Sequence, residues 1–319
     1  MSIYRIDSAS GALALVTPPT PLSWRPIYLT VDRDGKYLLV AYNFPSGLTV
    51  HRLASDGTIG PLVMQSPGLD MGIYGHQVRV APSNRLVILV TRGNEPGNGT
   101  SEDPGALKIF GFADGRLTPR GSIALDNGHA FRSRHLDFHP SGRWMYLTLE
   151  SQNRLLTFEI AADRVSQSPL FNTTTLSTSS PVRQQSASTV HVHPSGRFVY
   201  VGNRATGTTN NNGTAVFAGG ENTIAVFAID EHTGEPTHLQ SIDTRGVQPR
   251  TFALDPAGRT LVVGNQSALA RLENDRLTKV KAGLSVFKVG PDGQLAFVQK
   301  YDVETTAQRT LFWVGSFRR

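Results

Sequence analysis

The 319-residue sequence contains no cysteine. This absence excludes disulfide bonds, thiol nucleophiles and thiolate metal sites. No apolar run approaches the roughly 20 residues that a membrane-spanning helix needs. The first residues, Met-Ser-Ile-Tyr-Arg-Ile-Asp, lack the charged and then apolar pattern of a secretory signal. We therefore expect a soluble, cytoplasmic protein that does not enter a membrane.

Several motifs for catalysis and cofactor binding are also missing. The sequence has no phosphate-binding P-loop, no HExxH metal motif and no GxSxG nucleophile motif, and its nine histidines lack the spacing of metal ligands. We expect neither a metal nor a cofactor.

Charged residues make up only 18% of the chain, yet the 31 basic residues exceed the 25 acidic ones and give a net charge of +6. This excess favours anionic partners. Because Lys and Arg form no block and no basic helix, we expect a small carboxylate or phosphate and no nucleic acid.

Glycine and proline are abundant, with 31 and 19 residues, and apolar residues make up 39% of the chain. Together with the lack of long helical periodicity, this composition indicates a turn-rich all-β protein. A hairpin pattern, two alternating apolar runs around a tight turn such as Pro140-Ser141-Gly142, recurs five times. The copies cover residues 26–43, 76–92, 134–150, 189–204 and 249–266.

Each copy is followed by a second pair of predicted strands, so each unit has four strands and repeats about every 50 to 60 residues, which is typical of β-propeller blades. The chain starts with an outer strand pair at Ile3–Asp7 and ends with a strand at Thr310–Phe317. One blade shared by both ends would close the ring and remove exposed sheet edges. Counting it, we predict six blades in a single propeller domain over residues 1–319.

Two long segments interrupt the repeat. Residues 205–222 are of low complexity and are expected to be mobile, whereas residues 267–282 carry four basic residues and three leucines and suggest a short helix. Such loops are either padding or lids over a binding site, and the sequence leaves both readings open.

In a radial arrangement, the open ends of the inner hairpins all reach one face around the axis, which we predict to be the functional face. The turn ends carry ordinary turn residues, and we expect His139 and His193 there to be turn or packing residues. The residues at the open ends are Tyr42, Asn43, His76, Arg92, Arg134, His135, Glu150, Thr189, Asn203, Arg204, Arg250, Asn265 and Gln266.

Arginines can hold a carboxylate or phosphate and stabilise a developing oxyanion. A histidine or a glutamate can activate water or move a proton. The alternative is that these polar groups line a water-filled channel or tie blades together, and for any one residue the sequence does not decide between the two.

The sequence resembles the seven-bladed propeller lactonase family, which includes propeller-type 6-phosphogluconolactonases and fungal carboxy-muconate lactonizing enzymes. The resemblance extends over essentially the whole chain and lies in the motifs around Arg134–Arg143, His193–Arg204, Ile224–Asp230, Pro249–Arg259 and Val263–Gln266. It implies a catalytic set of His76, Arg134, Glu150 and Arg204. From the residues at the open ends, we expect a substrate-binding rim that includes His135, Asn203, Arg250, Asn265, Gln266 and Asn43.

Relatives usually begin one blade earlier, and they often carry an acidic residue where this chain has Thr189. We expect a metal-independent hydrolase that opens an anionic lactone, as 6-phosphogluconolactonases do. The alternatives are a muconate-type lactonizing cycloisomerase, or a propeller that binds an anionic sugar or metabolite without turning it over. The expected partner is a small lactone, sugar phosphate or carboxylate, and the protein is expected to be a monomer or a weak homo-oligomer.

Overall fold

The computed structural model describes residues 1–97, 99–178, 184–273, 276–306 and 309–316, which form strands, turns and irregular segments with a single short 3₁₀ helix among them. The chain divides into two compact units: residues 1–134 with 161–167, and residues 135–160 with 168–318. The single-domain organisation expected from the sequence stays a prediction.

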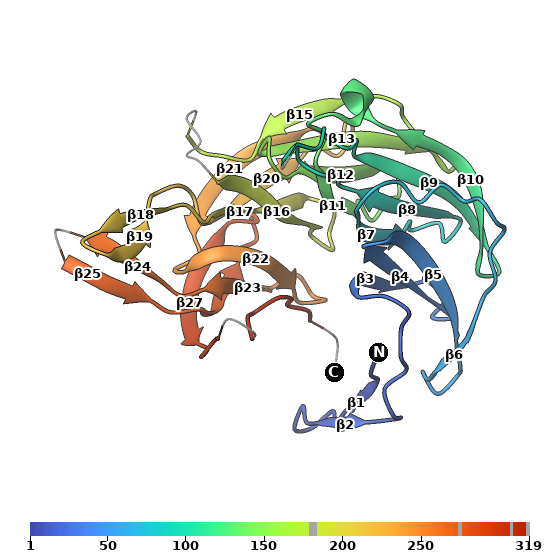
Figure 1. Cartoon of the computed structure of the whole chain (residues 1–319), viewed down its shortest axis with the longest axis horizontal. Coiled ribbons are helices and arrows are strands. Elements are labelled where there is room, and N and C mark those ends of the chain that lie inside the picture. The colour runs from blue at the N-terminus through green and yellow to red at the C-terminus, as the bar shows by residue number, and fades with distance from the viewer. Residues whose placement is uncertain (98, 179–183, 274–275, 307–308, 317–319) are drawn as a thin grey trace. The chain divides into compact units, whose positions relative to one another are not determined.

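The first unit contains two four-stranded antiparallel sheets of the predicted blade type (Figure 1). Blade one consists of β3 (Pro26–Val31), β4 (Tyr37–Asn43), β5 (Ser46–Leu53) and β6 (Ile59–Leu62). Blade two consists of β7 (Gly75–Val80), β8 (Leu86–Thr91), β9 (Ala106–Ala113) and β10 (Arg116–Ile123). A 3₁₀ turn, η1 (Leu125–Gly128), follows blade two.

The second unit contains three further blades. Blade three consists of β11 (Ser133–Phe138), β12 (Trp144–Leu149) and β13 (Arg154–Ala161), with β15 (Phe171–Thr174) paired to β13. The short strand β14 (Arg164–Val165) belongs to the first unit. Blade four consists of β16 (Gln185–Val192), β17 (Phe198–Ala205), β20 (Thr223–Ile229) and β21 (Pro236–Asp243). Blade five consists of β22 (Val247–Leu254), β23 (Thr260–Ser267), β26 (Gly283–Val289) and β27 (Leu295–Asp302). The prediction of an all-β protein with propeller-type blades is confirmed.

In blades one to four the second strand is buried along nearly its whole length, because both faces of its sheet are covered. In β8 every residue from Leu86 to Thr91 is buried, and β12 and most of β17 follow the same pattern. A continuous apolar run bounded by turns is the signature of such a strand. Apolar clusters lie between blades one and two, three and four, and four and five.

Aromatic residues after the inner turn join neighbouring blades of one unit. Gly234 in the outer turn of blade four has a φ of 77° and lies against the Trp144 ring of blade three, so that a Cβ at this glycine would overlap the indole. Gly293 lies in the same way on Phe198, and in the first unit Gly115 lies on Tyr37. Glycine is required at these turns both for its left-handed backbone and for the close approach of the ring.

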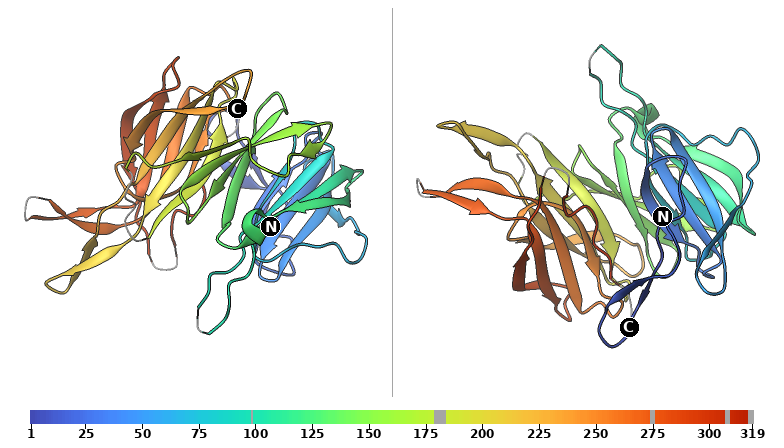
Figure 2. Two further views of the ribbon diagram at one scale, coloured as in Figure 1. Left: turned by 90° about the horizontal axis from the view of Figure 1, so that it is seen from above. Right: turned by 60° about the horizontal axis from the view of Figure 1, so that its bottom comes forward.

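The two interrupting segments form a separate sheet in the second unit. Its strands are β18 (Thr208–Asn211), β19 (Thr214–Phe217), β24 (Leu269–Glu273) and β25 (Arg276–Val280), in that order. The two hairpins meet through a parallel pairing of Val216 with Ala270, and both views of Figure 2 show them projecting away from the blades of this unit. The expected helix in residues 267–282 is therefore wrong. So short a helix is marginal by itself, and β24 and β25 pair with each other as a hairpin instead.

The prediction that the two chain ends share a blade is also wrong for the described residues. β1 (Tyr4–Ile6) and β2 (Leu13–Leu15) form a two-stranded sheet of their own, and residues 309–316 form no continuous strand. Phe317, the last residue of the predicted strand, lies outside the described residues. Five blades, rather than the six counted from sequence, are thus built from the part of the chain that is described.

Candidate active site

In blades one, two, four and five, the first strand carries a β-bulge near its open end. The register of pairing with the second strand shifts between Pro26 and Tyr28, Gly75 and Gln77, Ala187 and Val190, and Pro249 and Thr251. A bulge leaves a residue unpaired and re-aims its side chain, and bulges are common beside active sites. The bulges contain Ile27, His76, Ser188 with Thr189, and Arg250. Two predicted site residues, His76 and Arg250, are therefore set by a local backbone feature that the sequence pattern did not reveal.

The copies of the hairpin can be aligned by counting residues back from the inner turn of each copy. His76, Arg134 and Arg250 each stand five positions before the residue that opens the inner turn, and in the fourth copy this position is Ser188. At the end of the second strand, the matching positions are Asn43, Arg92, Glu150, Arg204 and Gln266.

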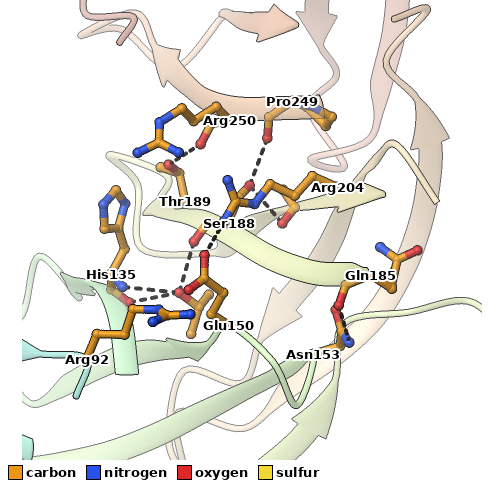
Figure 3. Close-up of polar contacts among 12 residues, drawn as sticks. Arg92, His135, Glu150, Asn153, Gln185, Ser188, Thr189, Arg204, Pro249 and Arg250 are labelled. Carbon is orange, nitrogen blue, oxygen red and sulfur yellow. Dashed lines mark hydrogen bonds and ion pairs between the residues drawn. The ribbon is translucent and has the colours of Figure 1, made fainter. Parts of the chain in front are cut away.

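In the second unit, Glu150 and Arg204 come together as an ion pair between Arg204 Nη2 and Glu150 Oε1 (Figure 3). Their side chains are only 9% and 12% exposed, respectively. Glu150 follows the last residue of β12, and its carbonyl accepts a hydrogen bond from Ala187 N at 3.0 Å, which draws β16 to the end of β12. Burying an ion pair removes water from both charged groups, and the pairing fixes their relative geometry. This pair therefore sets a carboxylate and a guanidinium at the open ends of two neighbouring repeats.

The bulge of β16 connects this pair to Arg250. Ser188 Oγ lies 2.9 Å from Pro249 O, and Thr189 Oγ1 donates to Arg250 O at 3.2 Å (Figure 3). On the other side of the bulge, Thr148 Oγ1 donates to Ser188 O at 3.0 Å. Hydroxyl groups thus hold the first strands of blades four and five against each other close to the open ends.

His76 and Arg134 belong to the first unit, where both are buried, with 6% and 1% exposure. Gly75, just before His76, donates from its N–H to Ser46 Oγ at 2.9 Å, and Ser133, just before Arg134, donates from Oγ to Thr91 O at 2.9 Å. A buried guanidinium is costly unless neighbouring groups hold it, and Arg134 has such interactions. Asn43 ends β4 in the same unit and is half-buried.

Asn203 and Asn265 are fully buried and act as ties between strands. Asn203 Nδ2 donates to Thr175 O at 2.6 Å, and Asn265 Nδ2 donates to Thr244 O at 3.1 Å. His135 is also buried, and its backbone carbonyl accepts a hydrogen bond from Thr148 Oγ1. These three residues stay predictions as substrate contacts, and their described hydrogen bonds are structural.

The turn ends behave as expected from the sequence. His139 Nδ1 accepts the Ser141 N–H at 3.1 Å, and its Nε2 donates to Gly196 O of the next blade at 2.9 Å. His193 makes the same pair of bonds, with Gly258 O as the acceptor across the blades. The prediction that both histidines are turn or packing residues is confirmed.

No group of three or more His, Cys, Asp or Glu side chains that could hold a metal ion occurs among the described residues. In the same part of the chain, no helix is both long and apolar enough to cross a membrane.

Comparison with known proteins decides the family. The family described as "Lactonase, 7-bladed beta-propeller" matches residues 1–270. The chain belongs to this family. A 6-phosphogluconolactonase of Bacillus subtilis is 26% identical over 300 residues, which cover 90% of this chain and 78% of the relative. A 6-phosphogluconolactonase of Pectobacterium carotovorum is 24% identical over 267 residues, covering 83% and 70%.

Solved structures agree with this lactonase fold. A periplasmic gluconolactonase of Pseudomonas aeruginosa superposes with a TM-score of 0.66 at 23% identity, over 95% of this chain and 77% of that protein. A protein from Lactobacillus plantarum superposes with a TM-score of 0.68 at 22% identity, over 97% and 79%. At these identities the structural likeness supports the fold.

Proposed function

We propose that this protein is a hydrolase that opens an anionic lactone of the 6-phosphogluconolactone type. The observation that carries the proposal is the Glu150–Arg204 ion pair at the open ends of neighbouring blades, in a chain of the lactonase family. The names of the curated relatives support a sugar lactone as the substrate class. The net charge of +6 supports an anionic one.

The proposed reaction is attack of water on the lactone carbonyl carbon. Glu150, held as a carboxylate beside Arg204, accepts a proton from the attacking water. The oxyanion of the tetrahedral intermediate is stabilised by the Arg204 guanidinium, which has N–H donors beyond the one that meets Glu150. The ring C–O bond then breaks, and the leaving alkoxide takes up the proton. The product is the open hydroxy acid.

Other predicted residues have separate proposed roles. Arg250 and Gln266 bind the substrate anion from blade five. His76 is the alternative general base and Arg134 a second arginine for the substrate, both inferred from their repeat positions and from the family resemblance. The proposed steps use no metal ion, so dialysis against a chelator should leave the rate unchanged.

The deciding experiment measures acid release from 6-phosphogluconolactone, corrected for spontaneous opening. Arg204→Ala and Arg134→Ala are each expected to lower kcat/KM at least about 100-fold, equivalent to roughly 2.7 kcal/mol of transition-state stabilisation. Arg197→Ala is the matched control, because Arg197 lies at the turn end of the same hairpin as Arg204 and is exposed. It should retain wild-type activity.

Three outcomes would overturn the proposal. Opening no faster than the spontaneous rate with every lactone tried would exclude a lactonase. Turnover of cis,cis-muconates in its place would indicate a lactonizing cycloisomerase. Tight binding of anionic sugars without turnover would indicate a binding protein.

Two further expectations stay predictions. A cytoplasmic location was expected from the sequence, and one similar structure is a periplasmic protein. A monomer or weak homo-oligomer was expected as well, and sedimentation of the purified protein tests it.

A further inference from the structure

Residues 310–316, here named the C-terminal strap, run over the inner strands of blade five. Gln266 Nε2 on β23 donates to Thr310 Oγ1 at 3.2 Å. The Arg250 guanidinium on β22 lies 4.2 Å from the centre of the Phe312 ring. Further along, Val314 packs on Gly264, and Ser316 Oγ donates to the carbonyl of Leu254. All of these residues belong to the second unit.

The contacts define which side of the strap faces the blade. Thr310, Phe312, Val314 and Ser316 alternate along the chain and all touch β22 or β23, as expected for an extended segment. Trp313 lies on the opposite side, 64% exposed, with its ring folded over Gly315. The strap therefore has one face directed at blade five and one face directed away from it.

The first two strap contacts fall on the two residues that blade five contributes to the proposed site. Arg250 is in the bulge of β22, and Gln266 is near the end of β23. When a guanidinium stacks on an aromatic ring, the flat face of the guanidinium contacts the ring. The N–H groups around the edge of the guanidinium then point away from the contact and can donate hydrogen bonds. Phe312 thus restricts the plane of the Arg250 side chain, and Thr310 restricts the Gln266 amide.

We propose that Phe312 and Thr310 are positioning residues for the substrate anion. They hold Arg250 and Gln266 in the orientation that receives a phosphate or carboxylate group of the substrate. The proposal rests on the proposed lactonase function and adds the strap to it. The strap itself contributes no reacting atom, so its loss should weaken substrate binding more than the chemical step.

The test compares KM and kcat for a phosphorylated lactone, 6-phosphogluconolactone, and an uncharged one, glucono-δ-lactone. Phe312→Leu and Thr310→Val are expected to raise KM for the phosphorylated lactone about tenfold or more, with kcat within about twofold of wild type. KM for the uncharged lactone should stay within about twofold, because it lacks the group that Arg250 would hold. Phe312→Tyr keeps the ring face and should restore the wild-type KM.

Trp313→Phe is the matched control, because Trp313 is an aromatic neighbour on the outward side of the strap. It should leave both KM values unchanged. An unchanged KM in Phe312→Leu would overturn the proposal, as would an equal rise for both lactones, which indicates a general structural role. A wild-type thermal unfolding curve for each variant confirms that it is folded.

A binding measurement separates failure of this proposal from failure of the proposed function. Calorimetry with 6-phosphogluconate, the open acid, needs no turnover. If the wild type opens no lactone but binds this acid, a roughly tenfold weaker Kd in Phe312→Leu still supports the strap, and an unchanged Kd overturns it. If the wild type neither turns over lactones nor binds the acid, both proposals are wrong.

Discussion

At the scale of single residues, one contact connects stability with the proposed chemistry. Arg204 and Glu150 face each other with little exposure to water, so each neutralises a charge that would be costly to bury alone. The same contact keeps Glu150 close to a group that can stabilise an oxyanion. Residues that serve both purposes cannot be replaced singly without a cost in stability.

A double-mutant cycle tests this coupling. Glu150→Leu leaves the mostly buried Arg204 guanidinium without its carboxylate, and we expect a loss of about 3 kcal/mol in the free energy of unfolding. The double variant Glu150→Leu/Arg204→Met removes both charges and should recover at least half of that loss. Urea denaturation measures all four corners of the cycle. Strictly additive single losses would show that the pair is not coupled.

At the scale of elements, the blades of one unit are joined at their turn ends by repeated contacts. The histidine before the turn bonds the next blade, and the aromatic residue after it packs under an outer-turn glycine. Tyr146 adds a hydrogen bond from its hydroxyl to Gly234 O at 2.8 Å, and burial raises the pKa of this phenol. These contacts stabilise the repeat and leave the opposite ends of the strands available for binding.

The His139 contact predicts a pH dependence of stability. Burial lowers the pKa of His139 below its ordinary value of 6.5, and its Nδ1 must be unprotonated to accept the Ser141 N–H. Below pH 6.5 the unfolded chain therefore takes up a proton that the folded chain resists, and stability falls as the pH decreases. Above pH 6.5 this contribution is complete and constant.

His139→Asn removes the titrating group, so its free energy of unfolding should fall less than that of the wild type between pH 7 and pH 5.5. His232→Asn is the control, because the His232 side chain is 83% exposed. Denaturation midpoints at each pH give the comparison. Parallel pH curves for wild type and His139→Asn would contradict the assignment.

The surroundings of the outer-turn glycines predict that two glycine-to-alanine substitutions lower the free energy of unfolding by different amounts. Gly234→Ala places a methyl group on the Trp144 ring and also strains a left-handed backbone, and we expect a loss of about 2–4 kcal/mol. Gly57→Ala occupies the equivalent turn of blade one, also with positive φ, but nothing lies within 4 Å of its Cβ position. It should cost about 1 kcal/mol. Equal losses, measured by urea denaturation, would show that the ring contact is unimportant.

At the scale of the whole molecule, the relevant property is the net charge of +6. A positive molecule attracts an anionic substrate over distances that salt screens, with a Debye length of about 10 Å at 0.1 M and about 3 Å at 1 M. The charge therefore acts on the encounter with substrate and not on the fold.

Salt should separate charged from uncharged substrates. Raising NaCl from about 20 mM to about 500 mM is expected to lower kcat/KM several-fold for 6-phosphogluconolactone and by less than about twofold for glucono-δ-lactone. The uncharged lactone is the control for effects of salt on the protein itself. Equal sensitivity of the two substrates would show that net charge does not contribute to substrate capture.

The sequence by itself determined the blade pattern, because alternation and turn residues act over neighbouring positions and recur in every copy. The same locality explains the correct prediction for His139 and His193, because the Nδ1 atom of each ring accepts a hydrogen bond from the turn that follows it. Their bonds to the next blade depend on how the blades pack. Glu150 and Arg204 were identified as candidates by repeat position, yet their pairing depends on blades three and four packing together.

Only the tertiary structure decided the features that join distant segments. The bulges at His76 and Arg250 depend on the register between two strands, which composition does not specify. Residues 267–282 read as a helix in isolation, but they form a hairpin in which β24 pairs with β25 and meets the hairpin of residues 208–217 through Val216 and Ala270. The C-terminal strap was expected to complete a blade, and its docking on Arg250 and Gln266 depends on surfaces formed only after folding. Local structure depends on interactions between residues that are close in the sequence, so a sequence pattern can predict it. Pairing between remote strands depends on how the folded chain packs, so only the tertiary structure shows it.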